Sequence, residues 1–212
     1  MGILKSGILG PFRKKIGPGI GRRHMGQNLL LPLPHKSSKP ATARQREAQT
    51  KLGLLNSFLN RIDEVVNIGF KRYTRHNSPV NAAFKYNYDH AFIKQGEKYE
   101  INYPEIIYSR GHIIAPEGAQ VASEPGKISF SWLPQNQSAY CQFTDAASFL
   151  VYNPVTKGAM MLLGTATRYA KNYVMTMPPD YIGVTVHCYM NFDSANGKLQ
   201  GDSFYIGTVL VV

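Results

Sequence analysis

One stretch of eleven residues, IGVTVHCYMNF at positions 182–192, alternates apolar and polar side chains. In an extended chain, successive side chains point to opposite faces. One face therefore carries Ile182, Val184, Val186, Cys188, Met190 and Phe192, and the other carries Thr185, His187, Tyr189 and Asn191. This pattern predicts an antiparallel strand that is half-buried, with only the apolar face in the core.

Further strands are predicted on both sides of this stretch. The candidates are Ile106–Arg110, Ala119–Ser123, Lys127–Leu133, Ser148–Asn153, Gly158–Leu163, Asn172–Met177 and Ser203–Val212. Turn sequences separate them, such as Asn153-Pro154 and the DSANG motif at 193–197. Seven or eight short strands with this spacing indicate an antiparallel, immunoglobulin-like β-sandwich over residues 99–212. The final run, with almost no charge, is expected to be a buried core strand, with an interface edge as the alternative.

A helical section is predicted over residues 41–98. After Pro40, the TARQ sequence at 42–45 fits a capping box, and Leu52, Leu55, Leu59 and Ile62 follow at spacings of three and four residues. This helix is expected to end around the NIGF sequence at 67–70. A second helix is predicted to begin at Ser78-Pro79 and to run toward Phe92. The predicted fold class is therefore α+β, mainly β.

Residues 1–40 form an arm that is rich in glycine and proline. These two residue types disfavour regular structure, so none is predicted here. The arm is nevertheless too apolar for a solvated linker, so we expect it to become ordered on a partner or on another copy of the chain. The candidate assembly residues are Ile3, Leu4, Ile8, Leu9, Phe12, Ile16 and Ile20.

Positive charge is concentrated in the N-terminal third. Residues 1–75 hold 15 Lys and Arg against three acids, whereas residues 76–212 hold nine against ten. Such a region favours phosphates, acidic protein surfaces or anionic membranes. The candidate contacts to phosphate or to an acidic surface are Arg13, Lys14, Lys15, Arg22, Arg23, Arg44 and Arg46.

The chain is expected to be made in the cytoplasm, without integral membrane association. No apolar run reaches the ~18 residues of a membrane span, and lysines interrupt the N-terminus where a secretory signal would be apolar. The two cysteines, Cys141 and Cys188, lie in apolar runs and are expected to be buried free thiols. A bridge between them remains the alternative in an oxidising compartment.

Several motifs resemble a family of bacterial domains of unknown function that is common in Bacteroidetes. They are GILG at 7–10, KIG at 15–17, NIGF at 67–70, LVYNP at 150–154 and FDSANGK at 192–198. The resemblance implies the same order of arm, helical section and β-sandwich, with no activity attached. It also argues against N-myristoylation, although the first six residues, MGILKS, match that signal.

No catalytic, metal or cofactor site is predicted from the residues. The six histidines lie in unrelated contexts and no metal-binding spacing occurs. His187 is expected to be a structural or surface residue, and Asp89-His90 a solvated pair. The leading hypothesis is a non-enzymatic structural protein that self-assembles through its arm, with no small-molecule ligand. A protein that binds the phosphates of nucleic acid is the alternative, and an enzyme of unrecognised type comes third.

Overall fold

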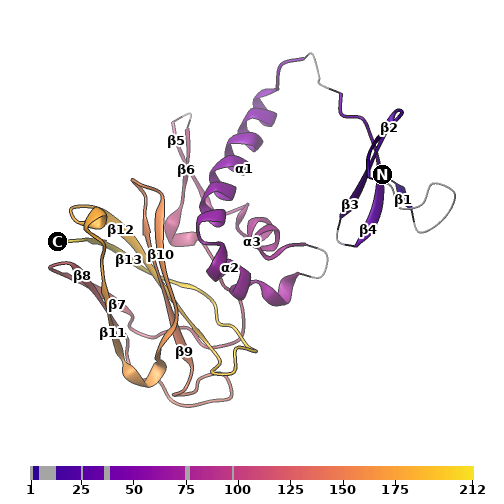
Figure 1. Ribbon diagram of the computed structural model, residues 1–212. Coiled ribbons are helices and arrows are strands. Elements are labelled where there is room, and N and C mark those ends of the chain that lie inside the picture. Colours follow the sequence, from indigo (N-terminus) through magenta and orange to yellow (C-terminus); the bar gives the residue numbers. More distant parts are fainter. Residues whose placement is uncertain (1, 5–12, 25, 36–38, 75–76, 97) are drawn as a thin grey trace. The chain divides into compact units, whose positions relative to one another are not determined.

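The computed structural model describes residues 2–4, 13–24, 26–35, 39–74, 77–96 and 98–212 (Figure 1). They form two compact units, Met1–Ala43 and Arg44–Val212, which we call the arm and the body. Strands outnumber helices, and every pairing between named strands is antiparallel. The predicted class, α+β and mainly β, is confirmed.

Two sheets form the centre of the body. The larger has the strand order β10-β9-β12-β13, with bounds Gly158–Thr167, Ala146–Asn153, Thr185–Asp193 and Phe204–Leu210. The smaller has the order β11-β8-β7, with bounds Asn172–Thr176, Lys127–Ser131 and Gln120–Glu124. All of these strands were predicted, within a few residues at each end. The last one, β13, lies at an edge of its sheet and is half-exposed, so the expectation of a buried core strand was wrong.

A first hydrophobic core fills the space between the two sheets. The larger sheet contributes side chains that alternate along β9 and β12, such as Phe149, Cys188 and Phe192, and the smaller contributes Ile128 and Phe130. Phe149 stacks on Tyr173 and contacts Phe130, with ring centroids 4.9 and 4.8 Å apart. The apolar face predicted for 182–192 is therefore correctly placed from Val186 onward.

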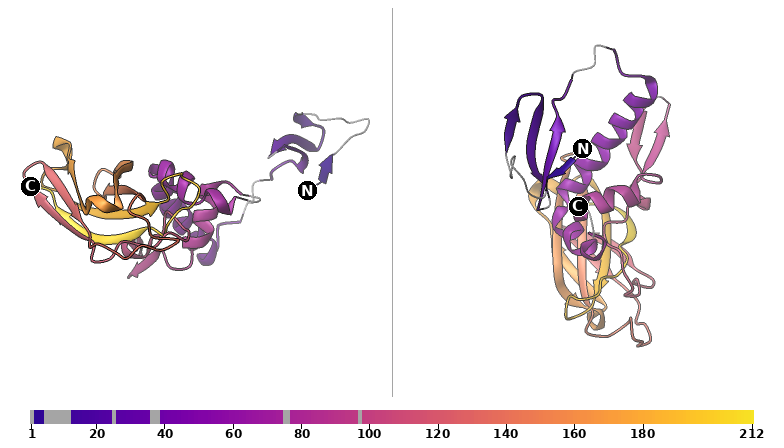
Figure 2. Two further views of the ribbon diagram at one scale, coloured as in Figure 1. Left: turned by 90° about the horizontal axis from the view of Figure 1, so that it is seen from below. Right: turned by 90° about the vertical axis from the view of Figure 1, so that its right-hand side faces the viewer.

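The opposite face of β9 and β12 is also buried, which corrects the prediction of a half-buried strand. A second core joins Leu150, Tyr152 and Tyr189 of the larger sheet to side chains of three helices. Figures 1 and 2 show these helices and the smaller sheet on opposite sides of the larger sheet. The alternation failed as a guide to exposure because Tyr189 and Asn191 are polar yet covered.

The helices of this layer are α1 (Ala43–Arg61), α2 (Asp63–Gly69) and α3 (Pro79–Asn87). The single helix predicted over the first two is interrupted at Ile62, whose φ of −117° is not helical. Leu55 and Leu59 are buried as the spacing predicts, but Leu52 is 46% exposed. Ser78 caps α3 as predicted, because its hydroxyl accepts a hydrogen bond from the Asn81 N–H at 3.3 Å.

The chain between α3 and the sandwich departs from the prediction. Helix α3 ends at Asn87, and a hairpin of β5 (Phe92–Gln95) and β6 (Lys98–Ile101) follows it. The strand predicted at Ile106–Arg110 does not exist, because a side chain takes the place of a partner strand. Asn87 donates to the Ile107 carbonyl at 2.7 Å and accepts from the Ile107 N–H at 2.8 Å.

Four short 3₁₀ helices complete the body. They are η1 (Lys71–Tyr73), η2 (Tyr103–Glu105), η3 (Arg168–Ala170) and η4 (Pro179–Tyr181).

The arm forms a sheet of its own, with the order β1-β4-β3-β2, so the prediction that it lacks regular structure was wrong. The bounds are Gly2–Leu4, Gln27–Pro32, Gly19–His24 and Lys14–Ile16. Gly17 and Gly26, with φ of 55° and 80°, lie in the turns that join β2 to β3 and β3 to β4. The glycines thus allow the tight turns of a small antiparallel sheet.

Within the described ranges, no helix combines the length and the apolar character that crossing a membrane requires.

Candidate functional site

Three of the predicted basic residues line one depression on the arm sheet. Arg13, Arg22 and Arg23, together with Gly21 and Gly26, surround a volume of about 470 Å³. All three arginine side chains are exposed. No ion pair involves any of them within the described part of the chain.

The pairing of β2 with β3 explains why this depression is strongly positive. Arg13 directly precedes β2, and Arg22 and Arg23 lie in β3, the strand that pairs with β2. The three arginines line the same depression, and like charges that lie close together repel. Lys14 also adopts a φ of 82°, which is unusual for a residue with a side chain. An anion at this position would relieve the repulsion.

The other predicted contact residues are not part of the depression. Lys14 and Lys15 lie in β2 without lining it, and Arg44 and Arg46 belong to the first turns of α1, in the body. Of the seven assembly residues, Ile3 and Leu4 lie in β1, Ile16 in β2 and Ile20 in β3. The remaining three, Ile8, Leu9 and Phe12, lie outside the described residues.

The arm sheet has apolar side chains on both faces. In β4, Leu29, Leu30 and Leu31 are consecutive, so Leu30 points to the face opposite the other two. Only Leu29 is fully buried among the described apolar side chains of the arm, whereas Leu30, Leu31 and Ile20 are half-buried. The small sheet therefore presents apolar surface in two directions.

A groove on the body was not foreseen from the sequence. Its volume is about 730 Å³, and its lining comes from α1, β6, η2, the end of β9 and the turn between β9 and β10. Phe58, Tyr103 and Tyr152 form its aromatic floor, with the Phe58 and Tyr152 ring centroids 4.7 Å apart. Burial raises the pKa of Tyr152 to about 12, so its hydroxyl stays protonated at neutral pH. No sequence signal could have identified the groove, because its residues are separated by up to about a hundred positions.

His187 faces the helical layer, behind this groove. Its ring stacks on Tyr103 at a centroid distance of 3.9 Å, and its Nδ1 lies 3.0 Å from the Tyr205 hydroxyl. Burial lowers the pKa of His187 to about 4, so the ring is neutral at physiological pH. These contacts agree with the predicted structural role.

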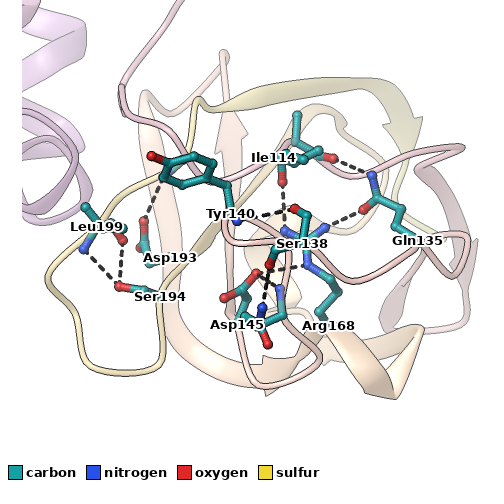
Figure 3. A network of polar contacts seen from close by, with 12 residues as sticks. Ile114, Gln135, Ser138, Tyr140, Asp145, Arg168, Asp193, Ser194 and Leu199 are labelled. Atoms are coloured by element: carbon teal, nitrogen blue, oxygen red, sulfur yellow. Dashed lines mark hydrogen bonds and ion pairs between the residues drawn. The ribbon is translucent and has the colours of Figure 1, made fainter.

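A buried polar network closes one end of the sandwich (Figure 3). The Arg168 guanidinium donates to Asp145 at 3.2 Å, to the Ile114 carbonyl at 2.7 Å and to Gln135. Its plane also lies over the Phe192 ring, with the guanidinium carbon 3.8 Å from the ring centroid. Arg168 and Asp145 are each 2% exposed. Because each of the three guanidinium nitrogens has an acceptor within the protein, the network holds loops together.

The described acids, histidines and cysteines are scattered rather than clustered. In the ranges that the structure describes, no three His, Cys, Asp or Glu side chains gather as metal ligands. Asp89 is exposed and His90 is half-buried, beyond the end of α3. His90 contacts the edge of the Tyr86 ring at a centroid distance of 5.6 Å. The two cysteines are free and buried.

Comparison with family models gives one match. The model described as "Family of unknown function (DUF6266)" matches residues 11–207, which covers most of the arm and almost all of the body. The comparison with curated proteins finds no match.

Proposed function

The chain belongs to the family of unknown function DUF6266, and we propose that it is a non-enzymatic structural subunit that assembles with copies of itself through the arm sheet. In this proposal, the protein is a bacterial subunit with an immunoglobulin-like sandwich, and its glycine-rich arm is the part that assembles.

The observation that carries the proposal is the small core of the arm. The arm unit, Met1–Ala43, contains a separate four-stranded sheet in which Leu29 is the one fully buried apolar side chain among those described. A unit of about 40 residues seldom supplies enough buried surface to be stable alone, and oligomerisation is one common remedy. Apolar residues on both faces of the sheet support this remedy, because a second copy could cover one of them.

The edges of the arm sheet suggest how two copies would meet. Strand β2 has two lysines among its three residues, and such charges hinder pairing with another strand. The other edge, β1, consists of Gly2, Ile3 and Leu4 and has no charge. We therefore place the contact between copies at β1, where added strands satisfy the free backbone groups.

Light scattering and negative-stain microscopy after nuclease treatment would test this proposal. We expect the full chain to form regular oligomers, and a chain without residues 1–40 to be monomeric. Ile3→Lys should weaken assembly by adding a charge to the free edge, and Leu31→Asp should weaken it by adding one to a sheet face. Val155→Asp is the matched control, because Val155 is an apolar residue of the body that is 75% exposed. A monomeric full chain, or oligomers that persist without the arm, would contradict the proposal.

A second candidate function is binding to the phosphates of nucleic acid. Arg13, Arg22 and Arg23 line one depression, and clustered arginines of this kind neutralise phosphates without reading a sequence. Three arginines that each neutralise one phosphate contribute about 2.7 to the slope of log K against log salt concentration.

This alternative can be separated from assembly by its salt dependence. Binding of labelled duplex DNA would be followed by fluorescence anisotropy across a salt series, for the full chain and for the triple variant Arg13→Gln, Arg22→Gln, Arg23→Gln. The control would be Lys127→Gln with Lys198→Gln, two exposed lysines of the body that are not among the candidate phosphate contacts. If the slope of log K against log salt concentration falls in the triple variant but not in the control variant, the result supports the alternative. An equal fall in the triple variant and in the control variant contradicts it.

A further inference from the structure

One arginine of the body, Arg110, is held by aromatic rings and has no side-chain hydrogen bond to any residue that the structure describes. Arg110 lines a pocket of about 410 Å³, together with Phe70, Tyr73, Ala82, Lys85 and Tyr86. The pocket lies where the end of α2, η1 and α3 meet the segment that follows Tyr108. All of these residues belong to the body, so the site is independent of any assembly through the arm.

Two tyrosine rings fix the position of the guanidinium. Its central carbon is 4.3 Å from the Tyr86 ring centroid and 5.1 Å from that of Tyr73. Phe70 is fully buried behind them and contacts both rings. Stacking engages the faces of a guanidinium and leaves its in-plane N–H donors free. The two ring contacts therefore hold Arg110 without using its N–H donors.

The backbone around Arg110 is equally well fixed. The Arg110 N–H donates to the Gly69 carbonyl at 3.2 Å, and the Gly111 N–H donates to Asp202 at 2.9 Å. Gly69 permits this close approach, because a Cβ at that position would lie 2.4 Å from the Cα of Ser109. The guanidinium is therefore presented by a rigid segment.

The contrast with Arg168 shows what is missing at Arg110. Arg168 donates to a carboxylate, an amide and a carbonyl. Arg110 has neither a carboxylate within 4 Å nor a side-chain hydrogen bond to any residue that the structure describes. A half-buried guanidinium without acceptors retains the donors that suit a carboxylate, which it can bind through two parallel hydrogen bonds.

The lining of the pocket defines the rest of the ligand. Its described residues include two cations, Arg110 and Lys85, and no acid. The walls are otherwise aromatic or aliphatic, apart from Asn77. We propose that this pocket binds a small carboxylate with an apolar, flat body, which Arg110 holds through its free donors and the tyrosine rings hold by packing. This goes beyond the sequence prediction, which included no small-molecule ligand.

The direct test is titration of the full chain with benzoate, followed by the ¹⁵N–¹H signal of the Arg110 Nε–H. We expect this signal to shift as benzoate is added and to reach saturation. Acetate lacks the aromatic ring and benzyl alcohol lacks the carboxylate, so each should bind at least about tenfold more weakly than benzoate. If benzyl alcohol binds as tightly as benzoate, or if about 10 mM benzoate leaves the signal unchanged, the proposal is wrong.

Variants separate recognition from folding. Arg110→Lys keeps the charge but loses the fork of donors, so calorimetry should show benzoate binding about tenfold more weakly. Lys85→Gln changes an exposed side chain, should leave the fold intact and should weaken binding about threefold. Arg72→Lys is the matched control, because Arg72 neighbours Tyr73 but does not line the pocket, and its affinity should be unchanged. Equal losses in all three variants, or no loss in any of them, would overturn the proposal.

Discussion

The two four-stranded sheets of this protein differ in what covers them. In the body, β9 buries seven of its eight residues, because one core lies on each face of the sheet. In the arm, β4 has three consecutive leucines and fully buries one of them. Both sheets have four strands and antiparallel pairing, so the type of hydrogen bonding does not distinguish them. A sheet buries its side chains only where layers lie beside it, and the described residues of the arm contribute to neither hydrophobic core.

The largest predicted effect concerns a body residue that packs between the two sheets. Phe149→Ala should lower the free energy of unfolding by about 4 kcal/mol, because it opens a cavity in a fully buried aromatic cluster. Leu29→Ala in the arm should shift the main unfolding transition by less than about 0.5 kcal/mol, because Leu29 belongs to the other unit. Denaturant titration of both variants would measure the two effects. Equal shifts would show that arm and body unfold together, and the two sheets would then not differ in stability as the comparison implies.

The next largest effect concerns the buried ion pair. Asp145→Ala should destabilise the body by about 3 kcal/mol, because it leaves the buried Arg168 without its carboxylate. The double variant Asp145→Leu, Arg168→Met should lose less than Asp145→Ala alone, since it removes both charges together. A double-mutant cycle of unfolding free energies would check this. A double variant less stable than either single variant would mean that the network contributes more than charge pairing.

Two titrating groups on the helix-facing side of β12 should have opposite effects on pH dependence. Burial raises the pKa of Asp193 to about 6, so its contribution to stability is present at low pH and is lost as the pH rises from about 4 to 6. Burial lowers the pKa of His187 to about 4, so its contribution is lost as the pH falls from about 6.5 to 4. The wild-type stability should therefore change little across this range.

Single variants would separate the two contributions. Asp193→Asn should become more stable as the pH rises from 4 to 6.5, whereas His187→Gln should become less stable as it rises from 4 to 6. Because both groups are partly exposed, we expect each change to be on the order of 1–2 kcal/mol. Denaturant titrations at pH 4 and pH 7 would measure them. If neither variant shows a slope, this face is more solvated than the second core implies.

The smallest predicted effect tests the helical layer that covers the body sheet. Ser78→Ala should destabilise the body by about 1 kcal/mol, because it removes the cap of α3. Ser78→Asp should retain most of the stability, since a carboxylate can accept the same hydrogen bond. Thermal unfolding of both variants would compare them. Equal losses would show that the cap contributes nothing and that packing alone holds α3.

The sequence predicted the elements that depend on local patterns. The alternation from Val186 to Phe192 located β12, and Ser78-Pro79 located the start of α3. It could not predict contacts between distant segments. The Asn87 bridge to Ile107 replaced a strand, and covering helices buried Tyr189 on the face of β12 that was predicted to be exposed. The Arg110 pocket combines residues from α2 to the segment after Tyr108, and no single motif connects them.

The two buried thiols allow the rate at which the body opens to be measured. Cys141 and Cys188 are each 1% exposed or less, and burial raises the pKa of Cys188 to about 12. Both belong to the body, so a thiol-reactive reagent can modify them only as fast as the body opens. The rate of thiol labelling in the unmodified protein would therefore report the opening rate of the body. It needs no introduced probe, and it does not depend on the conformation of the arm.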